Sequence, residues 1–492
     1  MTVIDVLDEV ATAHPDAEAY VDGKVRLTYA GLAARSAGWA DTLADHGIGR
    51  GDVVAISLPS SVEYAVAYVG ALRLGSVTTG INPRLGRREV AGIVARARPS
   101  AAIVEDGHSH EGFTGAAFHR RDVAGVSDGD PSSRRVRLSP DDPVAIVWTS
   151  GTTGEPKGAV YDHRRLEALS RATGELSRPF DRRLSPVPFA HVGYMTRLWD
   201  EIANVMTSVI VPTPWSARGA LDLIEQERIT VGQGVPTQWE LMLRQPDLDG
   251  WDVSSLRLIA TGAARVPAAL VAALRQAFGC PVVVRYATTE ASVIAGTMAA
   301  DPPTVVEATV GAPCPTVEVR IADDAGRPVP TGAVGMIEVR SPAVMCGYLG
   351  EDVESPIRAE GWLVTGDAGS LDEDGRIRLV GRRSEMYIRG GYNVYPLEVE
   401  QVLAEHPSVA EVAVAGVHDV VLGSVGMAWV VWVPGAPVPG LDGLRRWCKE
   451  QLADYKAPDR LTVVDFLPRS QMGKVDKLAL VAQAAASAAA DS

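Results

Sequence analysis

The stretch Thr149-Ser-Gly-Thr-Thr-Gly-Glu-Pro-Lys-Gly158 carries the strongest structural signal in this chain, and it directly follows the strand-like run Val144–Trp148. Its ten residues hold three glycines, four hydroxyl side chains and one lysine. Glycine lets backbone N–H groups approach a ligand closely, hydroxyls add donors, and the Lys157 ammonium suits phosphate oxygens. The residue order is not the Walker order Gly-x-x-x-x-Gly-Lys-Ser/Thr. The stretch therefore predicts a phosphate-binding loop of another kind, with a surface Ser/Thr/Gly turn as the alternative on composition alone.

Outward from this loop, helical segments alternate with short apolar strands. Segments with helical spacing that are rich in Ala, Leu and Arg include Ser61–Leu74 and Ala220–Glu227. The short Val- and Ile-rich runs between such segments include Val53–Leu58, Val144–Trp148, Ser208–Val211 and Val282–Arg285. This alternation is typical of an α/β domain whose strands are largely parallel and buried.

The pattern changes near Thr316. Runs of β type, such as Val317–Ile321 and Gly335–Val339, are separated by Asp/Gly clusters, which predicts a distorted, mostly antiparallel β subdomain. A smaller α+β pattern follows Gly381, and its expected elements are helix Pro396–Glu405, strand Val412–Val417, helix Leu441–Tyr455 and strand Leu461–Val464. We therefore expect a large N-terminal domain, residues 1–383, and a small α+β C-terminal domain, residues 384–492.

Composition excludes several classes of protein. The 492 residues include 47 basic and 61 acidic side chains, and a net charge of −14 argues against a general binder of nucleic acid or anionic membranes. Wholly apolar runs such as Ala268–Leu274 are too short for a transmembrane segment, and the first residues carry acid where a secretion signal carries Lys or Arg. The four cysteines lack CxxC spacing, so neither a disulfide framework nor a zinc site is indicated. These features predict a cytoplasmic globular protein.

Lysine is scarce in this chain. Only six of the 47 basic residues are lysines: Lys24, Lys157, Lys449, Lys456, Lys474 and Lys477. Coding bias alone would produce such scarcity. A retained lysine is informative where the local chemistry needs a compact ammonium rather than a planar guanidinium.

Five motifs in a fixed order resemble one known family. After the loop at residues 149–158 come Tyr286-Ala-Thr-Thr-Glu290, Gly361-Trp-Leu-Val-Thr-Gly-Asp367, the pair Gly381-Arg382 with Arg389-Gly-Gly-Tyr-Asn-Val-Tyr-Pro-Leu-Glu-Val-Glu400, and Pro468-Arg-Ser-Gln-Met-Gly-Lys474. Together they resemble the adenylate-forming superfamily of acyl-CoA synthetases, peptide-synthetase adenylation domains and luciferases. The resemblance covers essentially the whole chain. It implies ATP-dependent activation of a carboxylic acid to an acyl-adenylate, with release of pyrophosphate, and then transfer of the acyl group to a thiol.

The resemblance also implies a nucleotide site. The residues implied to hold the β- and γ-phosphates are Thr149, Ser150, Gly151, Thr152, Thr153 and Gly154, with Lys157 beside them. Those implied to bind the rest of the nucleotide are Thr289 at the α-phosphate, Gly262, Ala263 and Ala264 at the adenine edge, Tyr286 at its face, Asp367 at the ribose, and Arg382 at the ribose or phosphate. Glu290 is implied to hold Mg²⁺, a hard cation that prefers a carboxylate together with phosphate oxygens.

Both half-reactions are implied to use the C-terminal domain. Lys474 would lie between the attacking carboxylate and the α-phosphate, and Gly390 and Gly391 would line the passage for the pantetheine arm of CoA. Use of both requires this domain to be mobile. Two departures from the family pattern leave details open: Ser384 stands at the hinge in place of the usual Asp or Lys, and Ala287 stands where Gly is common.

The segment Pro188-Phe-Ala-His191-Val-Gly193 bears on the substrate. It resembles the His-containing segment of acyl- and aryl-CoA synthetases, which implies that His191 walls the carboxylate end of the acyl pocket. Peptide-synthetase domains have an Asp after this Phe, and no Asp follows Phe189 here, so an α-amino acid is disfavoured. We therefore expect a fatty or aryl monocarboxylate.

Three functions stay open at this point. The first is an AMP-forming acyl-CoA synthetase that uses ATP, Mg²⁺ and CoA. The second is an adenylating enzyme that passes the acyl group to a carrier protein, an amine or another nucleophile. The third is a non-catalytic nucleotide-binding relative, against which the presence of Glu290, Asp367, Arg382 and Lys474 argues. The chain length of the acid, the pathway and the oligomeric state, including a homodimer, are not set by these residues.

Overall fold

The computed structural model describes residues 1–108, 112–133, 136–149, 156–264, 266–350, 353–469 and 475–490, with side chains up to residue 485. Its contacts divide the chain into two units. The N-terminal unit comprises Met1–Val319, Glu338–Thr365 and Asp374–Ile377, and the C-terminal unit comprises Arg320–Ile337, Gly366–Glu373 and Arg378–Ser492. No helix within the described ranges is long and apolar enough to cross a membrane.

The larger sheet of the N-terminal unit has nine strands in the order β15-β14-β13-β12-β11-β9-β10-β1-β2. All neighbours from β13 to β1 run parallel, while the edge strands β14, β15 and β2 are antiparallel to their neighbours. Its strands are β1 (Glu18–Asp22), β2 (Val25–Thr28), β9 (Arg182–Ser185), β10 (Thr207–Ile210), β11 (Val231–Gly234), β12 (Leu258–Gly262), β13 (Val282–Thr288), β14 (Ser292–Gly296) and β15 (Ala312–Pro313).

The second sheet of the N-terminal unit has seven strands in the order β18-β8-β7-β4-β3-β5-β6. Strands β7 to β6 are parallel, and β8 and β18 add to the β7 edge in antiparallel fashion. Its strands are β3 (Val53–Ser57), β4 (Val77–Gly80), β5 (Ala101–Val104), β6 (Ala116–His119), β7 (Pro143–Thr149), β8 (Lys157–Asp162) and β18 (Gly347–Tyr348). The predicted parallel, buried strands are therefore confirmed.

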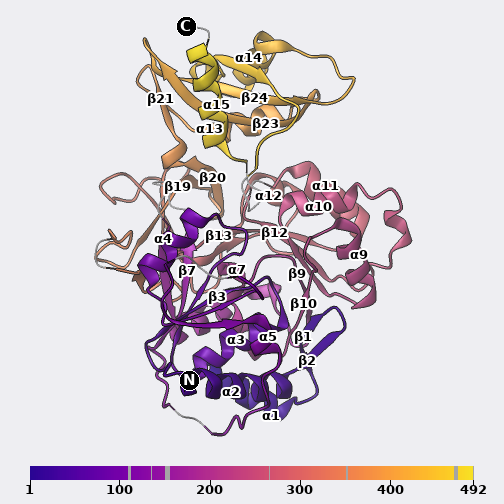
Figure 1. Ribbon diagram of the computed structural model, residues 1–492. Helices are drawn as coiled ribbons and strands as arrows, with labels where there is room; N and C mark the ends of the chain where they lie inside the picture. Colours follow the sequence, from indigo (N-terminus) through magenta and orange to yellow (C-terminus); the bar gives the residue numbers. More distant parts are fainter. Residues whose placement is uncertain are drawn as a thin grey trace. The chain divides into compact units, whose positions relative to one another are not determined.

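Helix α1 precedes β1, and the other helices lie between strands along the chain, as Figure 1 shows for α2, α3 and α9. The helices are α1 (Val3–Ala13), α2 (Tyr29–Asp45), α3 (Val62–Arg73), α4 (Arg87–Ala97), α5 (Arg120–Ala124), α6 (His163–Ala172), α7 (Val192–Met195), α8 (Leu198–Ala203), α9 (Ala217–Gln226), α10 (Pro236–Leu243), α11 (Ala268–Phe278) and α12 (Pro303–Ala308), with the 3-10 turns η1 (Gly174–Leu176) and η2 (Leu248–Gly250). Local chemistry sets their ends. Ser61 caps α3 by accepting a hydrogen bond from the backbone N–H of Tyr64, and Gly279 ends α11 with φ of +64°.

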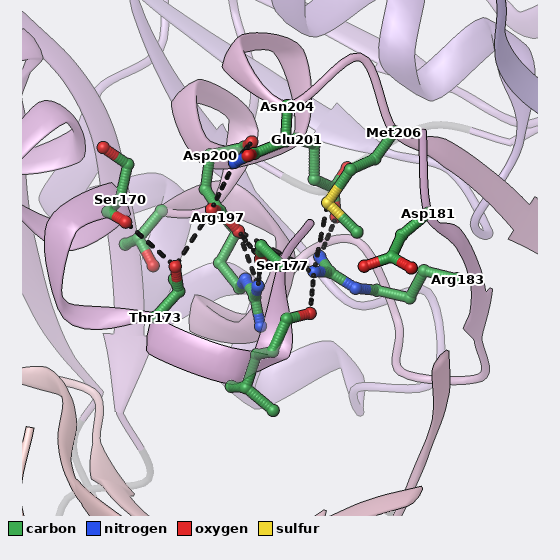
Figure 2. Close-up of polar contacts among 12 residues, drawn as sticks. Ser170, Thr173, Ser177, Asp181, Arg183, Arg197, Asp200, Glu201, Asn204 and Met206 are labelled. Carbon is green, nitrogen blue, oxygen red and sulfur yellow. Dashed lines mark hydrogen bonds and ion pairs between the residues drawn. The ribbon is translucent and has the colours of Figure 1, made fainter. Parts of the chain in front are cut away.

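A buried ionic cluster lies between β9 and the α7–α8 segment (Figure 2). Arg183 donates to Glu201 at 2.9 Å, and Arg197 donates to Asp200 at 2.6 Å. The hydroxyl of Ser177 donates to Asp200 at 2.7 Å and accepts from both arginines. Because two cations face two anions that also accept other hydrogen bonds, the charges balance in a region closed to water.

The C-terminal unit contains a sheet ordered β22-β21-β24-β23, with β25 parallel to β24. Its strands are β21 (Tyr387–Arg389), β22 (Tyr392–Val394), β23 (Val409–Asp419), β24 (Gly423–Trp432) and β25 (Arg460–Val463), and its helical segments are η3 (Arg383–Glu385), α13 (Pro396–Ala404), α14 (Gly440–Gln451), η4 (Asp454–Lys456) and α15 (Lys477–Ala490). A core that includes Val399, Leu403, Val414 and Leu444 lies between the sheet and α13 and α14. This is the predicted α+β pattern.

A fourth sheet, β16-β17-β19-β20, contributes residues to both units. It consists of β16 (Glu318–Ala322), β17 (Gly335–Arg340), β19 (Leu363–Leu371) and β20 (Ile377–Arg382). These strands lie where the Asp/Gly clusters predict a β subdomain. The predicted fold class, parallel α/β sheets with a β subdomain and a smaller α+β part, is confirmed.

Candidate active site

The two ends of the phosphate-loop motif lie side by side at the edge of the seven-stranded sheet. Thr149 is the last residue of β7, Lys157 is the first residue of β8, and the two are paired across the antiparallel strands. Gly158 is required by packing, because a Cβ atom there would lie 2.7 Å from Cγ2 of Ile146. The predicted phosphate-binding residues Ser150, Gly151, Thr152, Thr153 and Gly154 lie outside the described residues.

The Thr-Glu motif lies beside this edge. It forms the short link between β13 and β14, and three groups from residues 161 and 345–348 hold it. The hydroxyl of Tyr161 donates to the carbonyl oxygen of Thr289 at 2.6 Å, and the N–H of Met345 donates to the carbonyl of Glu290 at 2.9 Å. The hydroxyl of Tyr348 donates to Oε1 of Glu290 at 2.7 Å. Side chains from both sheets thus meet at Glu290.

Lys157 completes this group. Its Nζ atom lies over the ring of Tyr348, 5.5 Å from the centroid, which is a cation–π contact. Burial and the nearby charge of Glu290 raise the pKa of Tyr348, so its hydroxyl remains a hydrogen-bond donor. An ammonium, a phenol and a carboxylate therefore stand together next to the phosphate-loop motif.

The predicted adenine edge lies at the carboxyl ends of two parallel strands. Gly262 ends β12 and is paired with Arg285 of β13, whose carbonyl oxygen leaves no room for a Cβ atom at Gly262. Ala263 has a φ of +63°, and the side chains of Ala263 and Ala264 are exposed. Tyr286 is buried on the adjacent strand. Small exposed residues beside a tyrosine suit a flat ring, and the carboxyl edge of parallel strands is where ligands of open α/β sheets bind.

His191 is held by a residue that the sequence analysis does not name. Its Nε2 atom lies 3.0 Å from Nδ2 of Asn82, which follows β4. Oδ1 of Asn82 accepts from the N–H of Arg84 at 3.0 Å, and this orients the amide nitrogen toward the ring. An amide nitrogen can only donate, so Nε2 accepts and the neutral ring carries its proton on Nδ1. The next helix, α7, is tied to β14 by Thr196 and Ser292, whose hydroxyls are 3.2 Å apart.

The remaining predicted site residues belong to the C-terminal unit. Asp367 is buried, and its Oδ1 atom lies 2.9 Å from Nε of Arg382, so the two predicted ribose-binding residues form an ion pair. Gly390 and Gly391 form the turn between β21 and β22, with φ of +54° and +92°. A left-handed conformation at two successive residues favours glycine strongly.

The structure describes only the two ends of the motif that contains the predicted catalytic residue Lys474. Lys474 lies outside the described residues, but Arg469 and Val475 form a β-bridge around it, and the N–H of Asp476 donates to the carbonyl of Pro468 at 2.8 Å. Nζ of Lys477, at the start of α15, lies 2.7 Å from Glu385 and 2.8 Å from Glu400. Glu385 directly follows the predicted hinge residue Ser384.

The Glu290 region fits a magnesium ion that is held mainly by a nucleotide. No group of three or more His, Cys, Asp or Glu side chains that could hold a metal occurs in the described ranges. Mg²⁺ keeps several waters and is usually bound by one or two carboxylates plus substrate phosphates, so it needs no such group. Tyr348 occupies one carboxylate oxygen of Glu290 and leaves the other available for a cation.

The tertiary structure therefore brings Thr149, Lys157, Thr289 and Glu290 together in the N-terminal unit, and Asp367 with Arg382 in the C-terminal unit. Asn82, Tyr161 and Tyr348 also contact the site residues, and none of the three belongs to a sequence motif named above. Each contacts its partner across 58 to 128 residues of sequence, and no local pattern marks such a residue.

Two family models match most of the chain. The AMP-binding enzyme model matches residues 7–349, and the AMP-binding enzyme C-terminal domain model matches residues 398–474. The sequence is 35% identical to a (7a-methyl-1,5-dioxo-octahydro-1H-inden-4-yl)propanoyl:CoA ligase of Rhodococcus jostii over 97% of each chain. It is 34% identical to a feruloyl-CoA synthase of an Amycolatopsis species, over 95% of this chain and 96% of that one.

A solved structure gives the same result. ATP-bound MatB from Rhodopseudomonas palustris superimposes with a TM-score of 0.88 at 28% identity, over 98% of this chain and 99% of that one. The chain belongs to the AMP-binding enzyme family, as its sequence motifs predict.

Proposed function

We propose that this protein is an AMP-forming acid–thiol ligase that converts a fatty or aryl monocarboxylate into its CoA thioester. A carboxylate oxygen attacks the α-phosphorus of ATP and pyrophosphate leaves. The CoA thiol then attacks the acyl carbonyl, loses its proton and displaces AMP. The observation that carries this proposal is the meeting of Lys157, Tyr348 and Glu290 beside the glycine- and hydroxyl-rich loop motif.

Charge on phosphate oxygens is the main obstacle in the first half-reaction, so fixed donors and cations supply most of the catalysis. Lys157 and the N–H and hydroxyl groups of residues 149–154 hold the β- and γ-phosphates, and Thr289 donates to the α-phosphate. Glu290 would hold Mg²⁺, which would neutralise phosphate charge when bound. Gly262, Ala263, Ala264 and Tyr286 bind adenine.

The C-terminal unit completes both half-reactions. Lys474 offsets the like charges of the carboxylate and the α-phosphate, Asp367 and Arg382 bind the ribose, and Gly390 and Gly391 admit the pantetheine arm. A hinge at Ser384 between residues 1–383 and 384–492 alternates the role of Lys474 with that of Gly390 and Gly391, while Asp367 and Arg382 stay with residues 1–383.

An apolar acid is favoured by two observations. No Asp follows Phe189, where an amino-acid substrate would need one. The named relatives act on propanoyl groups that carry a bicyclic ring system and on feruloyl groups. The four free cysteines, none of them paired, support a reducing compartment, so we place the reaction in the cytoplasm.

A panel of carboxylic acids tests the proposal. Purified protein is incubated with ATP, Mg²⁺ and each acid, with and without CoA, and AMP and ADP are resolved. We expect AMP and pyrophosphate, with turnover that depends on CoA for at least one fatty or aryl acid. Turnover with a carrier protein or an amine but not with CoA would assign the alternative acceptor, and ADP as the product would contradict the scheme.

A further inference from the structure

Tyr348 has a contact at the site that no sequence motif assigns. Its hydroxyl donates to Oε1 of Glu290 at 2.7 Å, and within the described residues no other side chain hydrogen-bonds to that carboxylate. Resting on the proposed function, we infer that Tyr348 is a positioning residue that fixes the Glu290 carboxylate in the orientation that binds the divalent cation of the nucleotide.

The place of Tyr348 is set by backbone pairing. It lies in β18, where Tyr348 is paired with Ala159 of β8. The N–H of Cys346 donates to Val160 at 2.8 Å, and the N–H of Leu349 donates to Gly158 at 2.7 Å. Backbone hydrogen bonds on both sides of Tyr348 therefore fix the position of its Cα atom. From this position, a single side-chain rotamer brings the phenol hydroxyl to Glu290.

The backbone of Glu290 is held by the same segment. Its carbonyl accepts from the N–H of Met345, three residues before Tyr348. One short segment thus binds Glu290 at both its main chain and its side chain. Because a glutamate has several rotamers, a hydrogen bond to one oxygen selects the rotamer and directs the other oxygen toward a cation.

The ring of Tyr348 has a second contact. Lys157 begins β8 and lies two residues before Ala159, so the two side chains point to the same face of the sheet. Tyr348 is paired with Ala159 and is therefore the diagonal neighbour of Lys157, which explains the cation–π contact at 5.5 Å. The hydroxyl serves the carboxylate and the ring serves the ammonium, and substitution can separate these roles.

The test compares Tyr348→Phe, Tyr348→Leu and Glu290→Gln with the unmodified full chain. Removal of the hydroxyl alone should raise the Mg²⁺ concentration for half-maximal pyrophosphate exchange about 10-fold, the lower end of the usual effect of losing a group that orients a metal ligand. The KM for ATP at saturating Mg²⁺ should stay unchanged in the Phe variant and rise in the Leu variant, which also loses the ring. Electron paramagnetic resonance measures the binding of Mn²⁺ to the protein in the presence of α,β-methylene-ATP. In Tyr348→Phe, the Mn²⁺ affinity should fall by about the same factor as the Mg²⁺ requirement rises.

Tyr29→Phe is the matched control. The Tyr29 hydroxyl is buried and donates to the carbonyl of Met206 at 2.7 Å, so its loss removes a hydrogen bond of equal length elsewhere in the same unit. This variant should keep the normal Mg²⁺ requirement and Mn²⁺ affinity.

The outcomes separate the two proposals. If Glu290→Gln impairs cation binding and Tyr348→Phe does not, the role of Tyr348 is wrong and the proposed function stands. If Glu290→Gln leaves Mg²⁺ and Mn²⁺ binding unchanged, Glu290 is not the metal ligand. The metal-binding role of Glu290 in the proposed function and the positioning role of Tyr348 are then both wrong. If the double variant Glu290→Gln/Tyr348→Phe binds the cation no more weakly than Glu290→Gln alone, Tyr348 acts through Glu290.

Discussion

The guanidinium of Arg183 lies 2.9 Å from the carboxylate of Glu201, and both side chains are closed off from solvent. Arg183 extends from β9 of the nine-stranded sheet, and Glu201 belongs to α8. The pair therefore ties the helical segment that follows His191 to the centre of the sheet. Burial lowers the pKa of Arg183, and Glu201 opposes that shift.

Loss of one partner of this pair should destabilise the N-terminal unit. Glu201→Gln keeps the shape of the side chain but leaves a buried guanidinium without its nearest counter-charge, which typically costs about 3–5 kcal/mol. Thermal unfolding should show a melting temperature lower by several degrees. Glu318→Gln, which breaks the exposed pair between Arg340 and Glu318, should leave the melting temperature unchanged. Equal effects of the two substitutions would show that burial does not govern the contribution of the Arg183 pair.

Asn82 and His191 should act as one unit. His191→Ala and Asn82→Ala should each lower kcat/KM for the acid about 10-fold. The first variant lacks the imidazole ring and the second leaves it misoriented, so in both the carboxylate of the acid is poorly positioned. The double variant should be no worse than His191→Ala, since residues that share a hydrogen bond are not additive. Pyrophosphate exchange at varied acid concentration measures this, and additive losses would argue that Asn82 acts elsewhere.

Lys474 should be needed for only one half-reaction. Lys474→Ala should abolish pyrophosphate exchange and spare transfer of a premade acyl-adenylate to CoA, because the like-charge approach that the ammonium offsets occurs only in adenylation. Lys449→Ala, at an exposed lysine of α14, serves as the control and should leave both half-reactions intact. Equal loss of both halves in Lys474→Ala would sink the assignment of separate roles to the two half-reactions.

Gly391 should govern thioester formation. Its φ is +92° and a Cβ atom would meet no neighbour, so a large side chain projects into open space rather than into the core. Gly391→Trp should slow thioester formation about 100-fold by blocking the thiol arm, and should change adenylation little. Gly435→Trp is matched for backbone strain, since Gly435 has φ of +77° and open surroundings. A comparable loss in the Gly435 variant would assign the effect to strain alone.

His163 should make stability sensitive to acid. Burial lowers its pKa from 6.5 to about 4, and its Nδ1 accepts from the N–H of Val3 at 3.2 Å. In the unfolded chain His163 is protonated below about pH 6.5, whereas in the folded chain it is protonated only below about pH 4. The free energy of unfolding therefore decreases as the pH falls from 6.5 to 4. The loss should reach about 2 kcal/mol at pH 5.

The His163→Asn variant tests this acid sensitivity, since an amide oxygen can also accept from Val3 but does not titrate. Denaturant unfolding at pH 7.5 and pH 5 should show a smaller loss for the variant than for the unmodified protein. If the two proteins lose the same free energy of unfolding between pH 7.5 and pH 5, carboxylates alone govern the loss of stability in acid.

Local patterns predicted much of the fold. The Val- and Ile-rich run at 282–285 lies within β13, and the helical spacing at 61–74 matches α3, because side-chain periodicity is a property of residues close in sequence. Such local patterns do not predict the order of the strands in a sheet. Nothing near Arg182–Ser185 indicates that β9 lies between β10 and β11, since that placement depends on loop closure and on which faces are buried.

The candidate site divides in the same way. Its motif residues could be named from the sequence because glycine, hydroxyl and carboxylate positions a few residues apart reflect one local turn. The groups that orient these residues could not be named from the sequence, because they lie far away along the chain. Tyr348 contacts Glu290 across 58 residues, and Asn82 contacts His191 across 109. In isolation, Gly-Tyr at 347–348 is an unremarkable dipeptide.

The sequence by itself determined the family, the order of the motifs and the α/β class, because these depend on residue types and on local spacing. Only the tertiary structure decided which of the polar residues are buried. Asp181-Arg-Arg183 is a charged stretch typical of a surface, yet Arg183 lies in the interior among Glu201, Asp200 and Ser177. A buried charge is tolerable only when distant segments supply counter-charges and hydrogen bonds, and those segments meet only in the folded chain.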